Sequence, residues 1–273
     1  MSRNIERIRN AVFQECWAIQ QEKFDAILSV IESSTAEDCA AAAKVMSNPK
    51  SQLEVMEGVP VIPIRGVIAK RMNMFHAISG GTSIEAIDRM FDEAMAMDAP
   101  GIVLNIESPG GAVSGTPEFA DKVRDAAENS DKLIVAYADS LAASGAYWIG
   151  SQANTFIASR AAEVGSIGVI ASITDPTRAM RNAGYDETII RSSELKAPGA
   201  GPMTPRQEGS IRAKIETYYG MFKEAVLAGR GSIDIDSAAT GETWIGNDAV
   251  TMGLIDGIGS LASAVAMVRK NQH

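Results

Sequence analysis

A run of small residues around Ser144 includes the side chain best suited to covalent chemistry. The run follows an apolar, strand-like segment at 133–138 and leads into the short apolar segment Gly145-Ala146-Tyr147-Trp148. This order predicts a strand, a tight turn and a helix that begins beside Ser144, where unpaired backbone amides favour a developing negative charge. A nucleophilic serine needs such a setting. A buried helix start rich in small residues, with no chemistry, fits the same stretch equally well.

A glycine pair, Gly110-Gly111, follows a second predicted strand at residues 101–106. Glycine permits a positive φ and a close approach of the backbone to a ligand. The pair could therefore aim an amide at a carbonyl oxygen, as in an oxyanion hole. A plain tight turn between a strand and a helix also explains the pair.

The general base cannot readily be a histidine, because the sequence has only His76 and His273. Ala142 stands where the Gly-x-Ser-x-Gly motif of α/β-hydrolases has its first glycine, which disfavours that family. A lysine can act as the base where burial favours its neutral form. Lys196 lies in a Gly/Pro-rich segment, 192–202, that could form such a buried loop, although most lysines are solvated surface charges.

The composition is that of an acidic globular protein, with 46% hydrophobic residues and a formal net charge of −9. The acidic balance argues against a nucleic-acid partner, which would call for a basic patch. No apolar run reaches the roughly 18–20 residues that span a membrane, so no membrane anchor is expected. The two cysteines, Cys16 and Cys39, are too few for a disulfide framework or a metal site and indicate reduced thiols in the cytoplasm.

Strands that alternate with helices predict an α/β fold with mainly parallel strands. Strands are expected at 59–68, 101–106, 133–138, 154–158, 164–170 and 187–191, and helices from residues 84, 116, 175 and 204. Two prolines in the first of these strands favour an edge position. Ligand sites in such folds lie at the carboxyl ends of strands. Ser144 and Gly110-Gly111 both directly follow strands, so one site can hold both.

The N-terminal residues 1–57 are predicted to be helical, with an amphipathic helix at 16–32 and a second helix at 36–47. They show no strand pattern and no chemistry. We therefore expect a helical extension at 1–57 that packs on the main domain, 58–273, or on a partner. The apolar residues of the loop 69–81 suit a substrate contact or a subunit contact.

Four motifs occur in an order that resembles the signal peptide peptidase A family of Ser-Lys peptidases. The motifs are Ile106-Glu107-Ser108-Pro109-Gly110-Gly111, Ala142-Ala143-Ser144-Gly145-Ala146-Tyr147, Val164-Gly165-Ser166-Ile167-Gly168-Val169 and Glu194-Leu195-Lys196-Ala197-Pro198. With a similar C-terminal tail, the resemblance covers about residues 58–262. It implies a Clp-protease/crotonase-like fold and a serine endopeptidase that needs no metal and no cofactor.

The resemblance also implies a role for each matching side chain. Ser144 matches the nucleophile, Lys196 the general base, and Ser166 the serine that orients the lysine. The implied reaction is attack of Ser144 on a peptide carbonyl, followed by hydrolysis of the acyl-enzyme.

Backbone positions near the serine complete the implied site. Gly111 and Gly145 would supply the amides of the oxyanion hole. Gly110 and Ala143 would line the bound peptide.

The N-terminal segment, with Trp17-Ala18-Ile19-Gln20 ahead of Lys23, is similar to the phage and prophage branch of the family. Members of that branch resemble the lambda-type capsid protein C, a head maturation protease. This resemblance implies polypeptide substrates among capsid, portal and scaffold proteins, in the host cytoplasm or inside the phage procapsid. It also implies a homo-oligomer, with the loop 69–81 and the N-terminal helices as candidate subunit contacts.

Three alternatives remain open at this stage. A cytosolic peptidase of the same family could degrade released signal peptides or misfolded chains. A crotonase-type acyl-CoA enzyme would use the oxyanion glycines and leave Ser144 and Lys196 unexplained. A structural capsid-assembly component could have kept the fold and lost the activity. Cleavage specificity is expected to favour small or apolar residues before the scissile bond, because Ala and Gly surround the serine.

Overall fold

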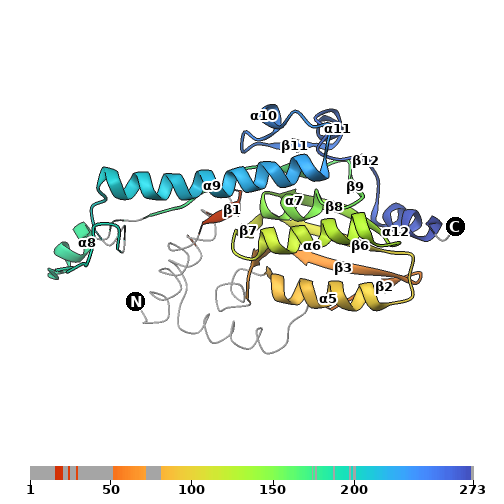
Figure 1. Cartoon of the computed structure of the whole chain (residues 1–273), viewed down its shortest axis with the longest axis horizontal. Coiled ribbons are helices and arrows are strands. Elements are labelled where there is room, and N and C mark those ends of the chain that lie inside the picture. Colours follow the sequence, from red (N-terminus) through yellow and green to blue (C-terminus); the bar gives the residue numbers. More distant parts are fainter. Residues whose placement is uncertain are drawn as a thin grey trace.

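The main sheet of the computed structural model has eight strands, most of them parallel, so the expected α/β architecture is confirmed (Figure 1). The structure describes residues 16–20, 24, 29, 52–71, 81–173, 175, 177–186, 188–196, 198 and 201–271. The strands run in the order β11-β10-β8-β6-β3-β2, and β9 and β12 join through the first half of β8. Their bounds are β2 Glu54–Met56, β3 Val59–Arg65, β6 Gly101–Ser108, β8 Leu133–Ala143, β9 Thr155–Ala158, β10 Glu163–Gly165, β11 Thr243–Ile245 and β12 Gly257–Ile258.

A second, four-stranded sheet has the order β1-β7-β4-β5. Its strands are β1 Trp17–Ile19, β4 Val67–Ala69, β5 Gly81–Ser83 and β7 Gly110–Ala112. This sheet continues two strands of the main one, because β4 follows β3 after Gly66 and β7 follows β6 after Pro109. It therefore lies directly beyond the carboxyl ends of β3 and β6.

Helices cover both faces of the main sheet. Their bounds are α5 Ile84–Ala96, α6 Thr116–Asn129, α7 Gly145–Gly150, α8 Thr177–Asn182, α9 Pro205–Gly229, α10 Ile235–Ala238, α11 Gly246–Thr251 and α12 Leu261–Lys270. Successive strand residues point to opposite faces. In β6, Ile102 and Leu104 join the core under α5, α6 and α7, whereas Val103 between them joins the core under α12. Burial on both faces explains the nearly continuous apolar runs of the central strands.

Three sequence expectations on strands need correction. The first strand does not lie at the edge: β2 covers β3 on one side over Val59–Val61, and β6 pairs with it on the other. Because β2 has only three residues, Pro63 still lies where β3 has a single neighbour, and its missing N–H costs no ladder bond there. Residues 188–191, expected within a strand, have no regular structure. The strand expected at 164–170 ends at Gly165, and residues 166–169 have no regular structure.

The N-terminal expectation needs correction as well. Trp17–Ile19 is a buried strand and not the start of a helix, and Glu54–Met56 is a strand too. Phe24 and Ser29 are helical, in agreement with the later part of the expected helix. The apolar side chains of Trp17 and Ile19 are buried because a second sheet receives them, which the sequence pattern of a helix could not reveal. The division of the chain at residue 57 stays a prediction.

Other expectations lie outside the described residues. These are the helix at 36–47, most of the loop 69–81, and the side chains of Cys39, His76 and His273. None of the described helices is long and apolar enough to cross a membrane.

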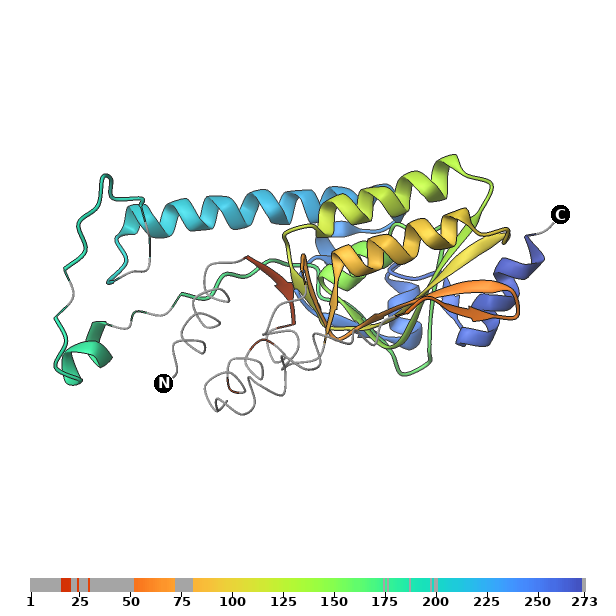
Figure 2. The ribbon, with the colours of Figure 1, turned by 90° about the horizontal axis from the view of Figure 1, so that it is seen from below.

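A long helix and the segment before it extend beyond the sheets. The C-terminal part of α9 packs on the body, and its N-terminal part projects outward with α8 at the far end (Figures 1 and 2). Thr204 caps α9 in a capping box with Gln207, as expected for a helix that starts at this position. We call residues 177–204, which include α8 and lead to this cap, the arm.

Candidate active site

Ser144 forms the turn between β8 and α7. Its φ of 53° and ψ of −120° lie outside the regions that ordinary residues occupy. The Ser144 amide donates to the Gly165 carbonyl at 2.7 Å, and Ser144 Oγ donates to the Gly168 carbonyl at 3.4 Å. The residue is fully buried. Strained backbone that the surroundings hold in place is typical of functional sites.

Ser166 lies beside Ser144 because of the sheet register. Strand β10 pairs in parallel with the end of β8, with Gly165 opposite Ala143, so each serine is the residue that follows. Ser166 also has a positive φ, 52°, and its amide donates to the Glu242 carbonyl at 2.6 Å. Two of the three non-glycine residues with positive φ in the described part of the chain are therefore neighbours.

The glycine pair lies against the same turn from the other side. At Gly110, where φ is +96°, an added Cβ would lie 2.8 Å from the Gly145 nitrogen and 2.9 Å from the Ala143 carbonyl oxygen. At Gly111 it would lie 1.8 Å from the Ile68 carbonyl oxygen. These positions require glycine. They also bring the amide nitrogens of Gly111 and Gly145 close together beside Ser144, the arrangement that an oxyanion hole needs.

Ser108, to which the sequence analysis gave no role, fixes the turn before the glycines. Its Oγ accepts from the Gly110 amide at 3.1 Å and donates to the Gly66 carbonyl at 2.6 Å. The side chain is fully buried. Its place in the Ser108-Pro109-Gly110-Gly111 motif could have drawn attention to Ser108. Its hydrogen-bond partner could not be found from sequence spacing, because Gly66 is 42 residues away.

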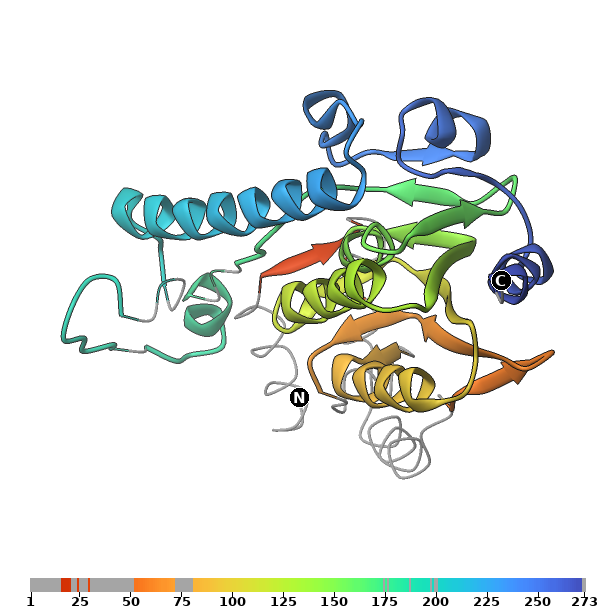
Figure 3. The same ribbon diagram turned by 45° about the vertical axis from the view of Figure 1, so that its right-hand side comes forward.

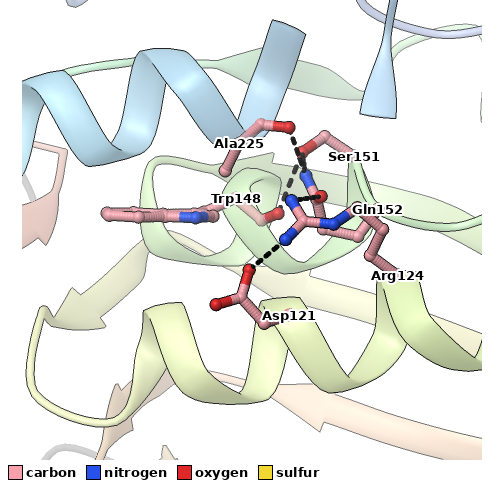
Figure 4. Close-up of polar contacts among 6 residues, drawn as sticks. All are labelled: Asp121, Arg124, Trp148, Ser151, Gln152 and Ala225. Carbon is pink, nitrogen blue, oxygen red and sulfur yellow. Dashed lines mark hydrogen bonds and ion pairs between the residues drawn. The ribbon is translucent and has the colours of Figure 1, made fainter. Parts of the chain in front are cut away.

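The far end of α7 is held by polar contacts between α6 and α9 (Figure 4). Gln152 Nε2 donates to Ser151 Oγ at 2.8 Å and to the Ala225 carbonyl of α9 at 2.9 Å. From α6, Arg124 donates to Gln152 Oε1 at 3.3 Å. Trp148 of α7 stacks on Phe222 of α9, with ring centroids 4.4 Å apart. These contacts fix the helix that carries the Gly145 amide.

Arg230 is a second clamp that sequence reasoning did not find. The buried guanidinium donates to the Ser151 carbonyl at 3.1 Å and to the Ala153 carbonyl at 2.5 Å, and it pairs with Asp256 at 2.7 Å. A buried arginine with three partners holds the end of α7 in one place. Burial also raises the pKa of Tyr147, which keeps its hydroxyl neutral as it donates to the Leu254 carbonyl at 2.9 Å.

Lys196 is not brought to Ser144. Residues 192–196 are exposed in the single chain, which does not form the expected buried loop by itself. The segment contacts the start of α9, where Gln207 Nε2 donates to the Glu194 carbonyl at 2.6 Å. Phe222, which stacks on α7, is 15 residues further along α9, or about 22 Å along the helix axis. Figures 1 and 2 show the segment between α8 and α9 at the end of α9 remote from α7.

The structure therefore brings together Ser144, Ser166, Gly110, Gly111, Ala143 and Gly145, and it leaves Lys196 apart. Within the described residues, no group of three or more His, Cys, Asp and Glu side chains could hold a metal ion. What the assembled part can do is hold a serine hydroxyl beside two backbone amides that can stabilise an oxyanion.

Comparison with known proteins identifies the family. The model of peptidase family S49 matches residues 126–273, which include both serines and Lys196. The chain belongs to peptidase family S49. The family assignment agrees with the order of the motifs around Ser144, Ser166 and Lys196, all of which lie within the match.

Individual relatives of this S49 chain include bacterial and phage proteins. It is 31% identical over 176 residues to "Probable protease SohB" of Haemophilus influenzae, covering 64% of this chain and 49% of that protein. It is 27% identical over 255 residues to "Head-tail preconnector protein GP5" of Enterobacteria phage P21, covering 91% of this chain and 49% of that protein. The chain thus spans about half the length of these two relatives.

A solved structure also resembles this chain. It is a mutant of the "1510-N membrane-bound stomatin-specific protease", with a TM-score of 0.44 and 13% identity over 76% of this chain and 82% of that one.

Proposed function

We propose that this chain is a serine endopeptidase in which Ser144 is the nucleophile. The observation that carries the proposal is the strained Ser144 turn, held beside the amides of Gly111 and Gly145. An acyl-CoA enzyme of the crotonase type would need the two amides but not a strained serine. Membership of family S49 favours the peptidase as well.

In the proposed reaction, Ser144 Oγ attacks the carbonyl carbon of a peptide bond and transfers its proton to Lys196. The oxyanion forms between the Gly111 and Gly145 amides, and the amine product leaves with a proton from Lys196. Water activated by Lys196 then hydrolyses the ester on Ser144. Ser166 orients the amine of Lys196.

The proposed substrate contacts are backbone ones. Gly110 and Ala143 lie against the turn of Ser144 and would line the bound peptide. No step of this mechanism requires a cofactor.

Lys196 must reach a Ser144, and we propose that it does so in a second copy of the chain. The arm exposes large apolar side chains, Tyr185 at 66%, Ile190 at 93% and Leu195 at 40%. Apolar residues gathered on an extended segment mark an interaction surface. Docking of the arm on a neighbouring copy would bury them and remove water from Lys196, which favours its neutral, basic form. The proposed active unit is therefore a homo-oligomer.

For the biological substrates, we propose phage or prophage head proteins, that is capsid, portal or scaffold subunits. The match to the phage relative GP5 covers 91% of this chain, so it extends into the N-terminal residues before 58. The name of that relative is that of a head-tail preconnector protein. The proposed site of action is the host cytoplasm or the interior of the procapsid. The similarity to SohB favours a second candidate, a peptidase of the same family that degrades released signal peptides or misfolded chains.

The experiment is a processing assay with the capsid-assembly proteins encoded beside this chain. Wild type, Ser144→Ala and Ser140→Ala are each co-expressed with these proteins, and the products are read by intact mass. Ser140 is an exposed serine on the same strand, so its variant controls for a serine lost from β8. We expect trimming of a partner by wild type and Ser140→Ala and a loss on the order of 10⁴-fold or more for Ser144→Ala. Equal trimming by all three would contradict the assignment of Ser144.

A peptide library separates the two candidate substrates. Cleavage of head proteins at a few defined bonds supports the maturation role. Ser144-dependent cleavage of many unrelated unfolded peptides, with the head proteins intact, supports the degradative peptidase.

A further inference from the structure

Strand β1 of the chain occupies the place where an extended peptide would meet Ser144. On one side it pairs antiparallel with β7, with Ala18 opposite Gly111 and Ile19 opposite Gly110. On the other side Trp17 exchanges two backbone bonds with Ile170, both of 2.8 Å. The segment is thus hydrogen-bonded along both edges. Figure 3 shows β1 in red, running toward the body beneath α9.

Further backbone hydrogen bonds at both ends of β1 lengthen its pairing with β7. The Cys16 carbonyl accepts from the Val113 amide at 3.0 Å, and the Gln20 amide donates to the Pro109 carbonyl at 3.1 Å. Five consecutive residues, 16–20, therefore lie antiparallel along β7 and the turn before it, the segment that contains Gly110 and Gly111. Addition of a strand to an exposed sheet edge is a general mode of peptide recognition, in which the backbone gives affinity and side-chain positions give specificity.

The carbonyl group of Ala18 lies beside the glycine pair and Gly145, with Ala18 opposite Gly111 in the strand pairing. Its oxygen is 2.2 Å from the position a Cβ would take on Gly110 and 3.2 Å from that on Gly145. The nitrogen of Gly111 lies 3.5 Å from the same point on Gly145. The peptide bond from Ala18 to Ile19 is therefore the bond placed beside the Ser144 turn. A larger side chain than that of Ala18 has little space, because Ala18 is completely buried.

The side chains of the segment are enclosed and apolar. Ala18 is 0% exposed, Trp17 2% and Ile19 4%. Trp17 also contacts the ring of Phe24 at 5.7 Å between centroids. Cys16 and Ala18 form a small core with Val113, against which Val169 and Tyr218 pack. Burial to this degree is what a specific peptide site gives its occupant.

We propose that residues 16–20 are an internal substrate, and that the chain cleaves its own Ala18–Ile19 peptide bond. The proposal rests on the proposed function, since Ser144 performs the cleavage. Ser144 Oγ adds to the Ala18 carbonyl carbon, the bond from that carbon to the Ile19 nitrogen breaks, and the amine takes up the proton released by the serine. Water then hydrolyses the Ala18 ester to a carboxylate. Until this happens, β1 closes the site to other polypeptides.

The specificity follows from the same geometry. The residue before the cleaved bond is alanine, in a position with no space for a long side chain, and the residue before it is large and apolar. Other substrates of this site are therefore extended segments with a small residue at the corresponding position.

The test follows the full-length chain over time by intact mass and by sequencing of new N-termini. We expect loss of residues 1–18 and a new N-terminus at Ile19 in wild type, and none in Ser144→Ala. In Ala18→Glu the cleavage should be at least tenfold slower, whereas Ala18→Ser should be processed like wild type. Ala96→Glu, the same change at an exposed position at the end of α5, is the matched control and should be processed normally.

A second readout separates this proposal from the proposed function. Each variant is also given an added unfolded protein as substrate, and Ser144 is labelled with a fluorophosphonate. We expect a lag before wild type cleaves the added protein, and no lag for Ala18→Glu, whose strand no longer fills the site. Cleavage of the added protein without any cut at Ala18–Ile19 would overturn the internal substrate and leave the peptidase. A cut that persists in Ser144→Ala would overturn self-cleavage, and absence of all cleavage would overturn both proposals.

Discussion

The residues around Ser144 and the arm that carries Lys196 differ in burial and in the way they are held. Ser144, Ser166 and the glycines are fixed by the register of β8 with β10, by β7, and by the clamps on α7. Lys196 is exposed. Among the described residues, the hydrogen bonds from its segment to other elements go to the projecting start of α9. The first region is held together within one chain, whereas Lys196 does not lie beside Ser144 in that chain.

The difference indicates how the proposed enzyme is controlled. The proposed oxyanion amides and the proposed nucleophile are pre-organised, which would give electrostatic stabilisation without rearrangement during the reaction. The proposed general base, Lys196, is carried on the exposed arm, which we propose docks on a neighbouring copy. Assembly, and not the folding of one chain, would therefore switch on catalysis, after the oxyanion site is already formed.

The largest effect that the comparison predicts comes from the arm. Lys196→Ala should lower kcat on the order of 10²–10⁴-fold, the usual contribution of a general base. Because Lys196 is exposed, the melting temperature of the chain should hardly change. Lys270→Ala, at an exposed lysine in the last turn of α12, is the control and should keep full activity. A fall in kcat that is accompanied by a large fall in melting temperature would contradict the role of Lys196 as a base.

A substitution in the pre-organised region around Ser144 should have a smaller effect on kcat, but it should also lower the free energy of unfolding. Gly110→Ala places a Cβ 2.2 Å from the Ala18 carbonyl oxygen and 2.8 Å from the Gly145 nitrogen, at a φ of +96°. A displaced oxyanion donor should reduce kcat about 10²–10³-fold, and the strained backbone should cost on the order of 1–3 kcal/mol of unfolding free energy. Steady-state kinetics and urea unfolding measure the two. Wild-type kinetics in this variant would show that the glycine turn does not position the site.

The smallest effect is expected where a glycine has no neighbours. Gly209 is exposed within α9, and no atom lies within 4 Å of its Cβ position. Gly209→Ala should therefore raise the unfolding free energy by about 0.5–1 kcal/mol through helix propensity, with no change in kcat. Urea unfolding checks the first part. A loss of activity here would show that this part of α9 lies in a contact required for catalysis.

Much of the pre-organised region could be predicted from the sequence. The motifs at Gly110-Gly111 and Ser144 each follow a predicted strand, and parallel strands bring their carboxyl ends to one edge. Ser166 is expected inside a strand at 164–170, whereas β10 ends at Gly165, directly before it. The α/β architecture and the start of α9 at its Thr204 capping box follow from local patterns in the same way. These features depend on hydrophobic periodicity and on residues close together in sequence.

The remaining features depend on distant partners. Trp17, Ile19 and Phe24 fit a helical face, and only the edge of β7 shows that the first two belong to a strand. Ser108 and Arg230 bind carbonyl groups tens of residues away, to which sequence spacing gives no guide. Lys196 is exposed because its segment contacts the projecting start of α9 and not the body, and a local Gly/Pro-rich pattern does not contain that information.

The most direct test of the proposed division between chains mixes two inactive variants. Ser144→Ala and Lys196→Ala chains are co-expressed with different tags, and the purified mixed assemblies are assayed on an unfolded protein substrate. If the arm supplies the base to a neighbouring copy, activity should return to about one quarter of wild type, since a random 1:1 assembly pairs an intact serine with an intact lysine at about one interface in four. A mixture as inactive as each variant alone would show that Lys196 serves its own chain and would contradict the account.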